Sequence, residues 1–268
     1  GMSGVVVDIG LFPIDTLKTR IQSGKVNFKE VNIYRGLTST VIGSFPSAAA
    51  FFASYDFTNH YLINKFKVTE DKRKYVNVLA SSVGECMGVA VRNPFELIKQ
   101  NMQVGNYPSI YQSARSIVQK EGFKGLYRGY FITVMREIPF STIQFPLYEH
   151  IKRKMIKYTN KQKLQSYSTN LNFPQASVCG ATAGTIAATI TTPFDVIKTR
   201  IMVNEKYGKY KDNSRNRVLN TIKEIYQVNH SLKDFFLGLK WRVTFISIGG
   251  VCFFGTNEYI KKRLGYVH

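Results

Sequence analysis

Apolar residues along the chain gather in six segments, and the stretches between them are rich in basic and polar residues. The segment 36–55 runs for twenty residues without a charge and the segment 173–194 for twenty-two, lengths that suit a helix crossing a bilayer. A shorter uncharged run covers 243–257. Because each third of the chain holds two such segments, the pattern predicts an all-α membrane protein with six transmembrane helices.

One octapeptide pattern occurs three times, at 13–20, 94–101 and 193–200, each time after an apolar segment. Proline comes first, an acid follows two residues later, and a lysine follows three residues after the acid. The copies are 81 and 99 residues apart, so one structural unit is used three times. We expect repeats over 1–66, 72–160 and 170–268 within one transmembrane domain. Since only twelve residues precede Pro13, we expect the first repeat to lack a few residues at its start.

The octapeptide predicts a ring of charges. Each proline removes a backbone donor and bends its helix, after which the acid and the lysine share one face of the next turn. Around a threefold axis each acid can meet a lysine of a neighbouring helix, which would form a closed gate. The alternative is that three kinked helices share the pattern by coincidence. We call the six residues the proline-motif ring: Asp15, Lys18, Glu96, Lys99, Asp195 and Lys198.

The repeated octapeptide resembles the signature of the mitochondrial carrier family, Pro-x-Asp/Glu-x-x-Lys/Arg-x-Lys/Arg. The resemblance implies a pseudo-threefold bundle with short surface helices, multi-pass in the mitochondrial inner membrane, whose proline-motif ring closes the matrix side. It also implies bracing glutamines, which are Gln22 and Gln103 here, while Met202 occupies the third position. Asn101 stands where the family has a base, so we expect a looser outer layer of the matrix-side gate.

A shorter motif ends the second apolar segment of each repeat, with an acid followed after three residues by a base or, once, by Asn59. By the family resemblance it forms a second ring at the cytoplasmic side. Because Asn59 replaces a cation, we expect this gate to be weaker than the matrix-side gate. The alternative is a set of solvated helix-end ion pairs, worth about 0.2–1 kcal/mol each. The residues of this cytoplasmic motif are Asp56, Glu149, Lys152, Glu258 and Lys261.

Composition adds a second candidate class. The net charge is +20 and the mean hydropathy of −0.14 is low for a membrane protein, which a bundle around a wet cavity with basic connections would explain. The basic residues gather in the connections 65–74, 152–163 and 206–217, which favours contact with anionic lipid headgroups. A soluble, basic nucleic-acid-binding repeat protein is the alternative from another class. No nucleophile–base arrangement, metal-ligand spacing or phosphate-binding glycine loop is visible, so we expect neither an enzyme nor a metal or cofactor.

Ionisable side chains inside spanning segments are costly unless they bind a partner or cargo. Aligning the second helices of the repeats on their acids places Gly43, Arg136 and about Ile246 at one level, which the family resemblance makes the contact site for cargo. Just beyond this level lie Ser44, Glu137 and Ser247. The ionisable candidates at mid-depth are Asp8, Glu85, Arg92, Arg136 and Glu137.

The pair of Arg136 and Glu137 predicts a grip on an α-amino acid, because a guanidinium binds a carboxylate in a bidentate way and an adjacent acid can take the ammonium. The alternative is that the two neutralise each other or serve the gates. Asp8 and Glu85 add negative charge, which favours a cargo with excess positive charge.

Small residues next to aromatic rings predict room for the rest of the cargo. Gly43 and the alanines 48–50 open space beside Phe51 and Phe52. Such a surface suits a flat base or, through cation–π attraction, a sulfonium.

Longer strings at 12–20, 44–52, 136–140 with 143–149, and 247–250 resemble a subgroup of the family. The resemblance implies a monomer that exchanges cytosolic S-adenosylmethionine for matrix S-adenosylhomocysteine by alternating access. The alternatives are a family member for a basic amino acid, one for an adenine nucleotide, for which we would expect more arginines at mid-depth, and a carrier-like scaffold that no longer transports.

Two glycine-containing stretches, 34–36 and 121–129, resemble the places where the family binds cardiolipin. There we expect a glycine that ends a helix and a base, Arg35 or Arg128, that meets lipid phosphate; an ordinary helix stop is the alternative. The runs 113–120 and 217–227 have helical apolar spacing with basic faces, which predicts short helices on the membrane surface.

Overall fold

The structure is a computed structural model that describes residues 2–24, 32–66, 73–162, 173–204, 214–229 and 231–249. Within these ranges every regular element is helical, which confirms the all-α prediction. The side chains of 1–8, and with them that of Asp8, lie outside the described part. Glu258 and Lys261 of the cytoplasmic motif also lie outside it.

Long helices alternate with short connecting ones. The elements are α1 (Met2–Ser23), α2 (Leu37–Phe66), α3 (Arg73–Gln103), α4 (Ile110–Glu121), η2 (Phe123–Tyr127), α5 (Tyr130–Gln162), α6 (Phe173–Val203), α7 (Ser214–Asn229) and η4 (Leu232–Phe236). A further helical stretch covers 239–249. The short helices α4 and α7 confirm the two helices expected at 113–120 and 217–227.

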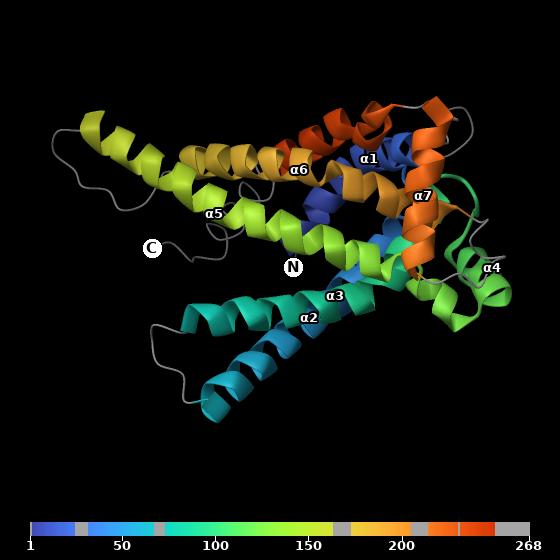
Figure 1. Cartoon of the computed structure of the whole chain (residues 1–268), viewed down its shortest axis with the longest axis horizontal. Coiled ribbons are helices and arrows are strands. Elements are labelled where there is room, and N and C mark those ends of the chain that lie inside the picture. Colours follow the sequence, from blue (N-terminus) through green and yellow to red (C-terminus); the bar gives the residue numbers. More distant parts are fainter. Residues whose placement is uncertain are drawn as a thin grey trace.

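The long helices converge at one end of the molecule and separate at the other. The helix pair α2 and α3 diverges from α5 and α6 toward the end away from α4 and α7 (Figure 1). Pro13, Pro94 and Pro193 lie inside α1, α3 and α6, which continue through the octapeptides to their ends at 23, 103 and 203. The octapeptides therefore occupy the last turns of these helices, at the convergent end.

Each second helix of a repeat begins against the first helix of the next repeat. The glycine at its start has a φ of 94°, 84° or 76°, a conformation open to glycine because it has no Cβ. An added Cβ would lie within about 3 Å of the neighbouring helix, so the contact closes a circle of three repeats. Gly36 and Gly129 precede α2 and α5, while Gly122, within the stretch 121–129, ends α4 as the sequence predicted. The contacts are Gly36 on Lys99 of α3, Gly129 on Met202 of α6, and Gly238 on Gln22 of α1.

The pair α2 and α3 approaches closely through glycines, as small residues allow in membrane bundles. An added Cβ at Gly84 would lie 3.0 Å from the carbonyl oxygen of Phe51, and one at Gly88 3.3 Å from its Cβ. An added Cβ at Gly43 would lie 2.7 Å from Cβ of Phe95. Phe95 thus packs against Gly43, and both residues line a cavity described below.

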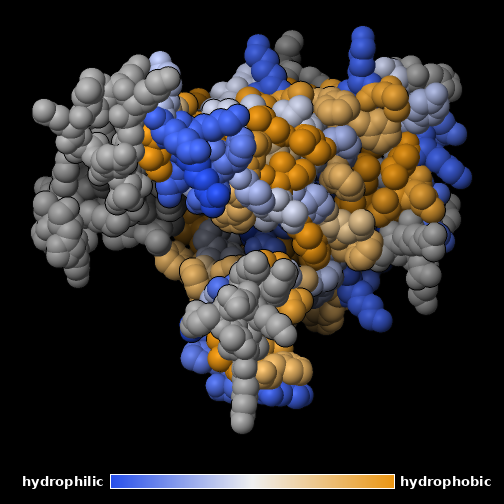
Figure 2. Space-filling model, turned by 60° about the vertical axis from the view of Figure 1, so that its left-hand side comes forward, coloured by the Kyte–Doolittle hydropathy of each residue, from blue (hydrophilic) through white to orange (hydrophobic). Residues whose placement is uncertain are grey.

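Large apolar side chains cover much of the outer surface, where Phe45, Phe57 and Phe145 are each more than half exposed. Figure 2 shows hydrophobic residues spread over the face in view and a hollow between its upper and lower parts. A surface with this many exposed aromatic residues is suited to lipid contact. No helix within the described ranges is both long enough and apolar enough to be identified by hydropathy as a membrane-crossing segment.

Candidate functional site

Three acid–lysine pairs join the last turns of α1, α3 and α6. Each lysine contacts the acid of a different helix, so the pairs form a closed circuit around the bundle axis. This is the proline-motif ring, and the structure brings all six of its members together. The distances between lysine nitrogen and carboxylate oxygen are 2.7 Å for Lys99–Asp15, 2.6 Å for Lys198–Glu96 and 2.8 Å for Lys18–Asp195.

Glutamines from neighbouring helices support two of the three pairs. Gln22 donates to Oδ2 of Asp195 at 3.0 Å and accepts from the hydroxyl of Thr199 at 3.1 Å. Gln103 donates to Oδ2 of Asp15 at 3.0 Å. Both glutamines are fully buried, so each amide holds its carboxylate away from water, as expected of a brace.

The third pair is supported differently. Met202 packs in an apolar cluster with Leu97 and Ile117, so it offers no hydrogen bond to the ring. Glu96 instead accepts from Nε2 of Gln100 at 3.2 Å, from the next turn of its own helix. The sequence analysis missed Gln100 because it took the braces from the family's bracing position, which Met202 occupies here; a spacing of i,i+4 to the acid would have identified it.

A second layer lies just beyond the ring, at the ends of the same three helices. The last residue of each octapeptide donates a hydrogen bond to the terminal backbone of a neighbouring helix, where carbonyls lack intrahelical partners. The bonds are Arg20 to the carbonyl of Gln103 at 2.8 Å, Asn101 to that of Met202 at 3.0 Å, and Arg200 to that of Gln22 at 3.3 Å.

Asn101 does not open this layer, contrary to the prediction. Its side chain is buried, and two further residues bind the same helix end. Arg128 donates to the carbonyl of Met202 at 2.6 Å and Asn106 to that of Val203 at 3.2 Å. These bonds supply what a longer basic side chain at position 101 would have made.

Arg128 therefore faces inward. Its guanidinium forms a close ion pair with Glu121 and is almost fully buried. Arg128 also lines a cavity with Lys124 and Arg217, so the expectation that this base meets lipid phosphate stays a prediction.

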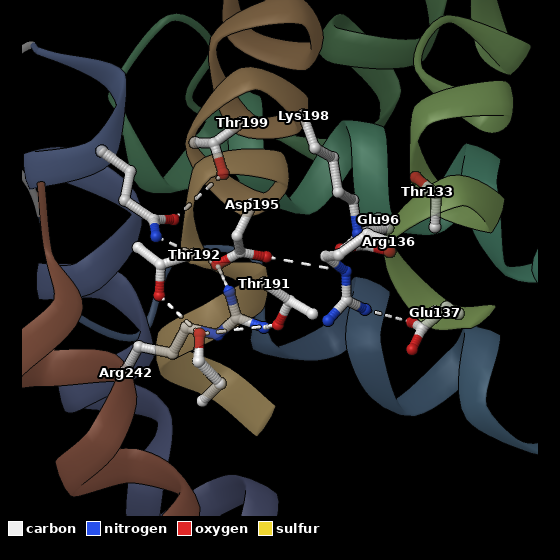
Figure 3. A network of polar contacts seen from close by, with 12 residues as sticks. Glu96, Thr133, Arg136, Glu137, Thr191, Thr192, Asp195, Lys198, Thr199 and Arg242 are labelled. Atoms are coloured by element: carbon white, nitrogen blue, oxygen red, sulfur yellow. Dashed lines mark hydrogen bonds and ion pairs between the residues drawn. The ribbon is translucent and has the colours of Figure 1, made fainter. Parts of the chain in front are cut away.

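The space beside the ring holds a second group of charges, in which Arg136 links the ring to Glu137 (Figure 3). Arg136 forms a close ion pair with Glu137, and its Nε lies 3.6 Å from Oδ1 of Asp195. Arg92 of α3 reaches the same oxygen of Glu137 at 2.9 Å. This geometry corresponds to the alternative interpretation, in which Arg136 and Glu137 neutralise each other and serve the gate.

Arg242 is a charged residue of this site that the sequence analysis missed. It lies 3.6 Å from Oδ2 of Asp195, donates to the hydroxyl of Thr191 at 2.8 Å, and its side chain is only 3% exposed (Figure 3). It was overlooked because the last apolar segment was taken to begin at Val243. The equivalent positions one helical turn after Gly36 and Gly129 are Thr40 and Thr133, so the repeat gave no signal for a charge at this place.

Three adjoining cavities extend from the ring along α2 and α3. The ring cavity, of about 230 Å³, is lined by the six ring residues with Arg136 and Arg242. The middle cavity, of about 400 Å³, shares Glu96, Lys99 and Arg136 with it. The aromatic cavity, of about 330 Å³, shares Ser47 and Arg92 with the middle one. The shared residues show that neighbouring cavities adjoin along α3.

Most of the described candidates for cargo contact line these cavities. Gly43, Ser44, Arg136 and Glu137 line the middle cavity. Phe51, Phe52 and Glu85 line the aromatic cavity. Ser247 lies apart from these linings, with its hydroxyl 3.3 Å from that of Thr185.

The described residues of the cytoplasmic motif are not joined by acid–base pairs between helices. Lys152 lies 4.0 Å from Glu149 of its own helix, and Asp56 is exposed. Asn59 donates to the hydroxyl of Tyr55 at 3.3 Å and to Asn77 of α3 at 3.2 Å. Within the described ranges the motif makes no ion pair between helices, so one end of the bundle is closed by charge pairs while the other is apart.

Comparison with known proteins gives a family and several similar proteins. A family model described as "Mitochondrial carrier protein" matches residues 1–66, 71–159 and 169–267. The "Mitochondrial S-adenosylmethionine carrier protein" of Danio rerio is 40% identical over 98% of this chain and 95% of its own length, and that of Mus musculus is 38% identical over 98% and 92%. The "Probable S-adenosylmethionine carrier 2, chloroplastic" of Arabidopsis thaliana is 39% identical over 98% of this chain and 72% of its own length.

Proposed function

The chain belongs to the mitochondrial carrier family, and from this we propose that it exchanges S-adenosylmethionine for S-adenosylhomocysteine across the mitochondrial inner membrane. Members of the family are transporters and not enzymes, and the chain is a multi-pass protein of that membrane. The observation that carries the choice of cargo is an identity of about 40% with curated S-adenosylmethionine carriers over nearly the whole chain.

The two ends of the bundle supply the gates of an alternating-access cycle. The proline-motif ring is closed in this structure and the cytoplasmic motif is apart, which corresponds to a carrier open toward the cytosol. Opening the ring separates three partly buried ion pairs, and stripping one partner from such a pair costs about 3–5 kcal/mol. Cargo must offset this cost by binding more tightly to the state in which the proline-motif ring opens than to the state in which the ring is closed.

The cavity chemistry fits a cargo that joins an amino acid, a sulfonium and adenosine. Arg92, Arg136 and Glu137 supply both signs of charge for an amino-acid head. Phe51 and Phe52 present aromatic faces for an adenine ring or a sulfonium. The cargo would thus lie along the middle and aromatic cavities, beside the ring that it opens.

Cardiolipin is the lipid partner in this proposal, bound by a monomer. A cavity of about 370 Å³ lies between the start of α5 and the start of α7, lined by Lys124, Gly129 and Arg217 among others. Lys124 and Arg217 can meet a phosphate there, beside Arg128, which lines the same cavity.

One observation favours the alternative that the cargo is an adenine nucleotide. Arg242 adds a third arginine beside the cavities, after Arg92 and Arg136, and a nucleotide carrier needs such cations for phosphates. Any test of the cargo therefore has to include ATP.

Ligand-induced thermal stabilisation of the detergent-solubilised protein tests the cargo. A ligand that binds the folded state raises the Tm according to its concentration over its dissociation constant. S-adenosylmethionine and S-adenosylhomocysteine are expected to raise the Tm, while ATP and arginine at equal concentration leave it unchanged. Stabilisation by ATP or arginine alone would replace the assigned cargo while retaining the gates.

A further inference from the structure

We propose that Arg92 of α3 couples cargo binding to the opening of the proline-motif ring. In the closed state Arg92 pairs with Glu137. Cargo that takes Glu137 releases Arg92 toward Glu96, where it replaces Lys198. The inference rests on the proposed function and refines it, because it leaves the amino-acid head on Arg136 and Glu137 and names the residue through which the gate responds to that head.

Arg92 lies between the cargo site and the ring. Its Nη2 is 2.9 Å from Oε1 of Glu137, and its Nε is 4.0 Å from Oε2 of Glu96. Glu137 lines the middle cavity, whereas Glu96 lines both the middle cavity and the ring cavity. One guanidinium therefore faces an acid of the cargo site and an acid of the gate.

The side of Arg92 that faces the gate has no hydrogen bond in the closed state. Nε of Arg92 is buried and makes no hydrogen bond to the described residues. Lys198 holds the other oxygen of Glu96, Oε1, at 2.6 Å. Arg92 and Glu96 are four residues apart on α3, so they stay neighbours when α3 separates from α6. Arg92 can thus become the cation of Glu96 once Lys198 leaves.

Cargo competes with Arg92 for Glu137. Arg92 and Arg136 contact the same oxygen of Glu137, so an ammonium that binds this acid displaces one of the two guanidiniums. The carboxylate of the cargo holds Arg136 in place, because a guanidinium binds a carboxylate in a bidentate way. Arg92 is therefore the residue that leaves.

The two acids that Arg92 leaves gain the positive charges of the cargo. Glu137 exchanges Arg92 for the ammonium and keeps Arg136. Glu85, whose Oε1 lies 3.7 Å from Nη2 of Arg92, lines the aromatic cavity, where the sulfonium can take the place of the guanidinium. Each acid of the cargo site thus retains a cation.

The charges of the ring are compensated in the same way. Glu96 gains Arg92 when Lys198 departs with α6. Lys198 has Asp195 three residues earlier on its own helix, on the same face. Opening therefore exchanges the partner of Glu96 and does not leave a buried acid unpaired, which would be strongly unfavourable.

This arrangement occurs in one repeat of the three. The positions four residues before the other two ring acids hold Leu11 and Thr191, which carry no charge. Arg92 thus gives the second repeat a cation on the helix of its own ring acid, and we expect the contact between α3 and α6 to open first.

Exchange kinetics in reconstituted liposomes test this coupling, with uptake of S-adenosylmethionine against internal S-adenosylhomocysteine by wild type and Arg92→Gln. A charged hydrogen bond that forms only as the ring opens changes the maximal rate about 10- to 100-fold. We expect Arg92→Gln to lower the maximal rate by this factor. The KM for S-adenosylmethionine is expected to stay the same or fall, because the ammonium no longer competes with a guanidinium for Glu137.

A second substitution separates coupling from a structural role. Gln100 donates to Oε1 of Glu96 at 3.2 Å and supports the closed ring. We expect Gln100→Ala, added to Arg92→Gln, to raise the maximal rate of that variant at least about threefold, because a weaker closed state opens more readily. Arg115→Gln, an exposed change on α4, is the control and leaves exchange unaltered. Should Arg92→Gln fail to reconstitute, Arg92→Lys keeps the charge that moves and is expected to retain part of the rate at an unraised KM.

An unchanged maximal rate in Arg92→Gln would overturn the assignment. A KM for S-adenosylmethionine raised about tenfold at the wild-type maximal rate would also overturn it, because Arg92 would then bind the cargo itself. A lowered rate that Gln100→Ala does not raise would reduce Arg92 to a structural role, with the same consequence. A wild-type protein that exchanges neither S-adenosylmethionine nor S-adenosylhomocysteine would instead sink the proposed function, and this inference with it.

Discussion

At the scale of single residues, the three acids of the proline-motif ring have unequal surroundings. Asp195 lies near two guanidiniums in addition to its lysine, at 3.6 Å each from Arg136 and Arg242. Asp15 pairs with Lys99 and accepts from Gln103. The sequence motif is the same in the three repeats, but more positive charge lies beside Asp195 than beside Asp15. This asymmetry predicts which ion pairs tolerate a reversal of their charges.

Reversing the charges of a ring pair is expected to be tolerated at Asp15 and not at Asp195. The double variant Asp15→Lys with Lys99→Asp keeps an ion pair in the same place. The double variant Asp195→Lys with Lys18→Asp sets a lysine beside Arg136 and Arg242, where each like-charge contact near 4 Å costs about 1–4 kcal/mol. The Tm and the exchange rate in liposomes measure the difference, and equal losses in the two double variants would contradict the account.

Removing a bracing amide should weaken the closed state. Gln22→Ala deletes the bond to Asp195 and the one from Thr199, and a hydrogen bond to a charged group contributes about 1.5–3 kcal/mol. We therefore expect a lower Tm for Gln22→Ala in detergent. Gln112→Ala, an exposed change on α4, is the matched control. A Tm of Gln22→Ala equal to that of Gln112→Ala and of wild type would contradict this expectation.

The residues that the sequence predicted best are those with a repeated spacing. The ring members were identified because proline, acid and lysine recur in register, and the structure brings all six together. Arg242 and Gln100 were missed because neither belongs to a repeated motif. Arg242 acts through contacts between helices and Gln100 through a contact within its own helix. The residue spacing of one sequence does not show which side chains make such contacts.

At the scale of helices, the closest packing is between α2 and α3. Glycines face aromatic residues there, with Gly84 and Gly88 against Phe51 and Gly43 against Phe95. The two helices also carry most of the lining of the middle and aromatic cavities. The spacing of α2 from α3 therefore sets the shape of the cargo space.

A methyl group at Gly43 should disturb this spacing. In Gly43→Ala the new Cβ would lie 2.7 Å from Cβ of Phe95, and overpacking of this kind costs about 1–3 kcal/mol. Gly180→Ala on α6 is the control, because an added Cβ there meets nothing within 4 Å. We expect the first variant to lower the Tm and raise KM for cargo while the second changes neither. Wild-type behaviour of Gly43→Ala would show that α2 and α3 adapt freely.

Helix positions were largely predictable, and helix contacts were not. The apolar periodicity predicted the short helices α4 and α7. The octapeptides predicted where α1, α3 and α6 have their last turns. Gly122 ends α4 as expected, whereas Gly36 and Gly129 stand at the start of the next helices, where their positive φ serves a close contact with another repeat. The local sequence shows that a glycine is present, but it does not show which residue of another helix lies against that glycine.

At the scale of the whole molecule, the structure has one closed and one open end. Both charged motifs can be identified in the sequence. The sequence pattern therefore predicts two gates, but it does not predict which gate is closed in the structure. The closed end has three short ion pairs, two bracing glutamines and a layer of capped helix ends. The cytoplasmic motif has Asn59 in place of one cation and no ion pair between helices in its described part; the difference in strength between the two gates stays a prediction.

The central claim is exchange of S-adenosylmethionine for S-adenosylhomocysteine through a gate tied to the cargo site by Arg136. Its most direct test is uptake of labelled S-adenosylmethionine into liposomes that carry the purified protein and are preloaded with S-adenosylhomocysteine, beside an Arg136→Ala variant. The account predicts rapid uptake that depends on the internal S-adenosylhomocysteine and is lost in the variant. Absence of uptake by wild type, with ready exchange of ATP or arginine, would contradict the assigned cargo.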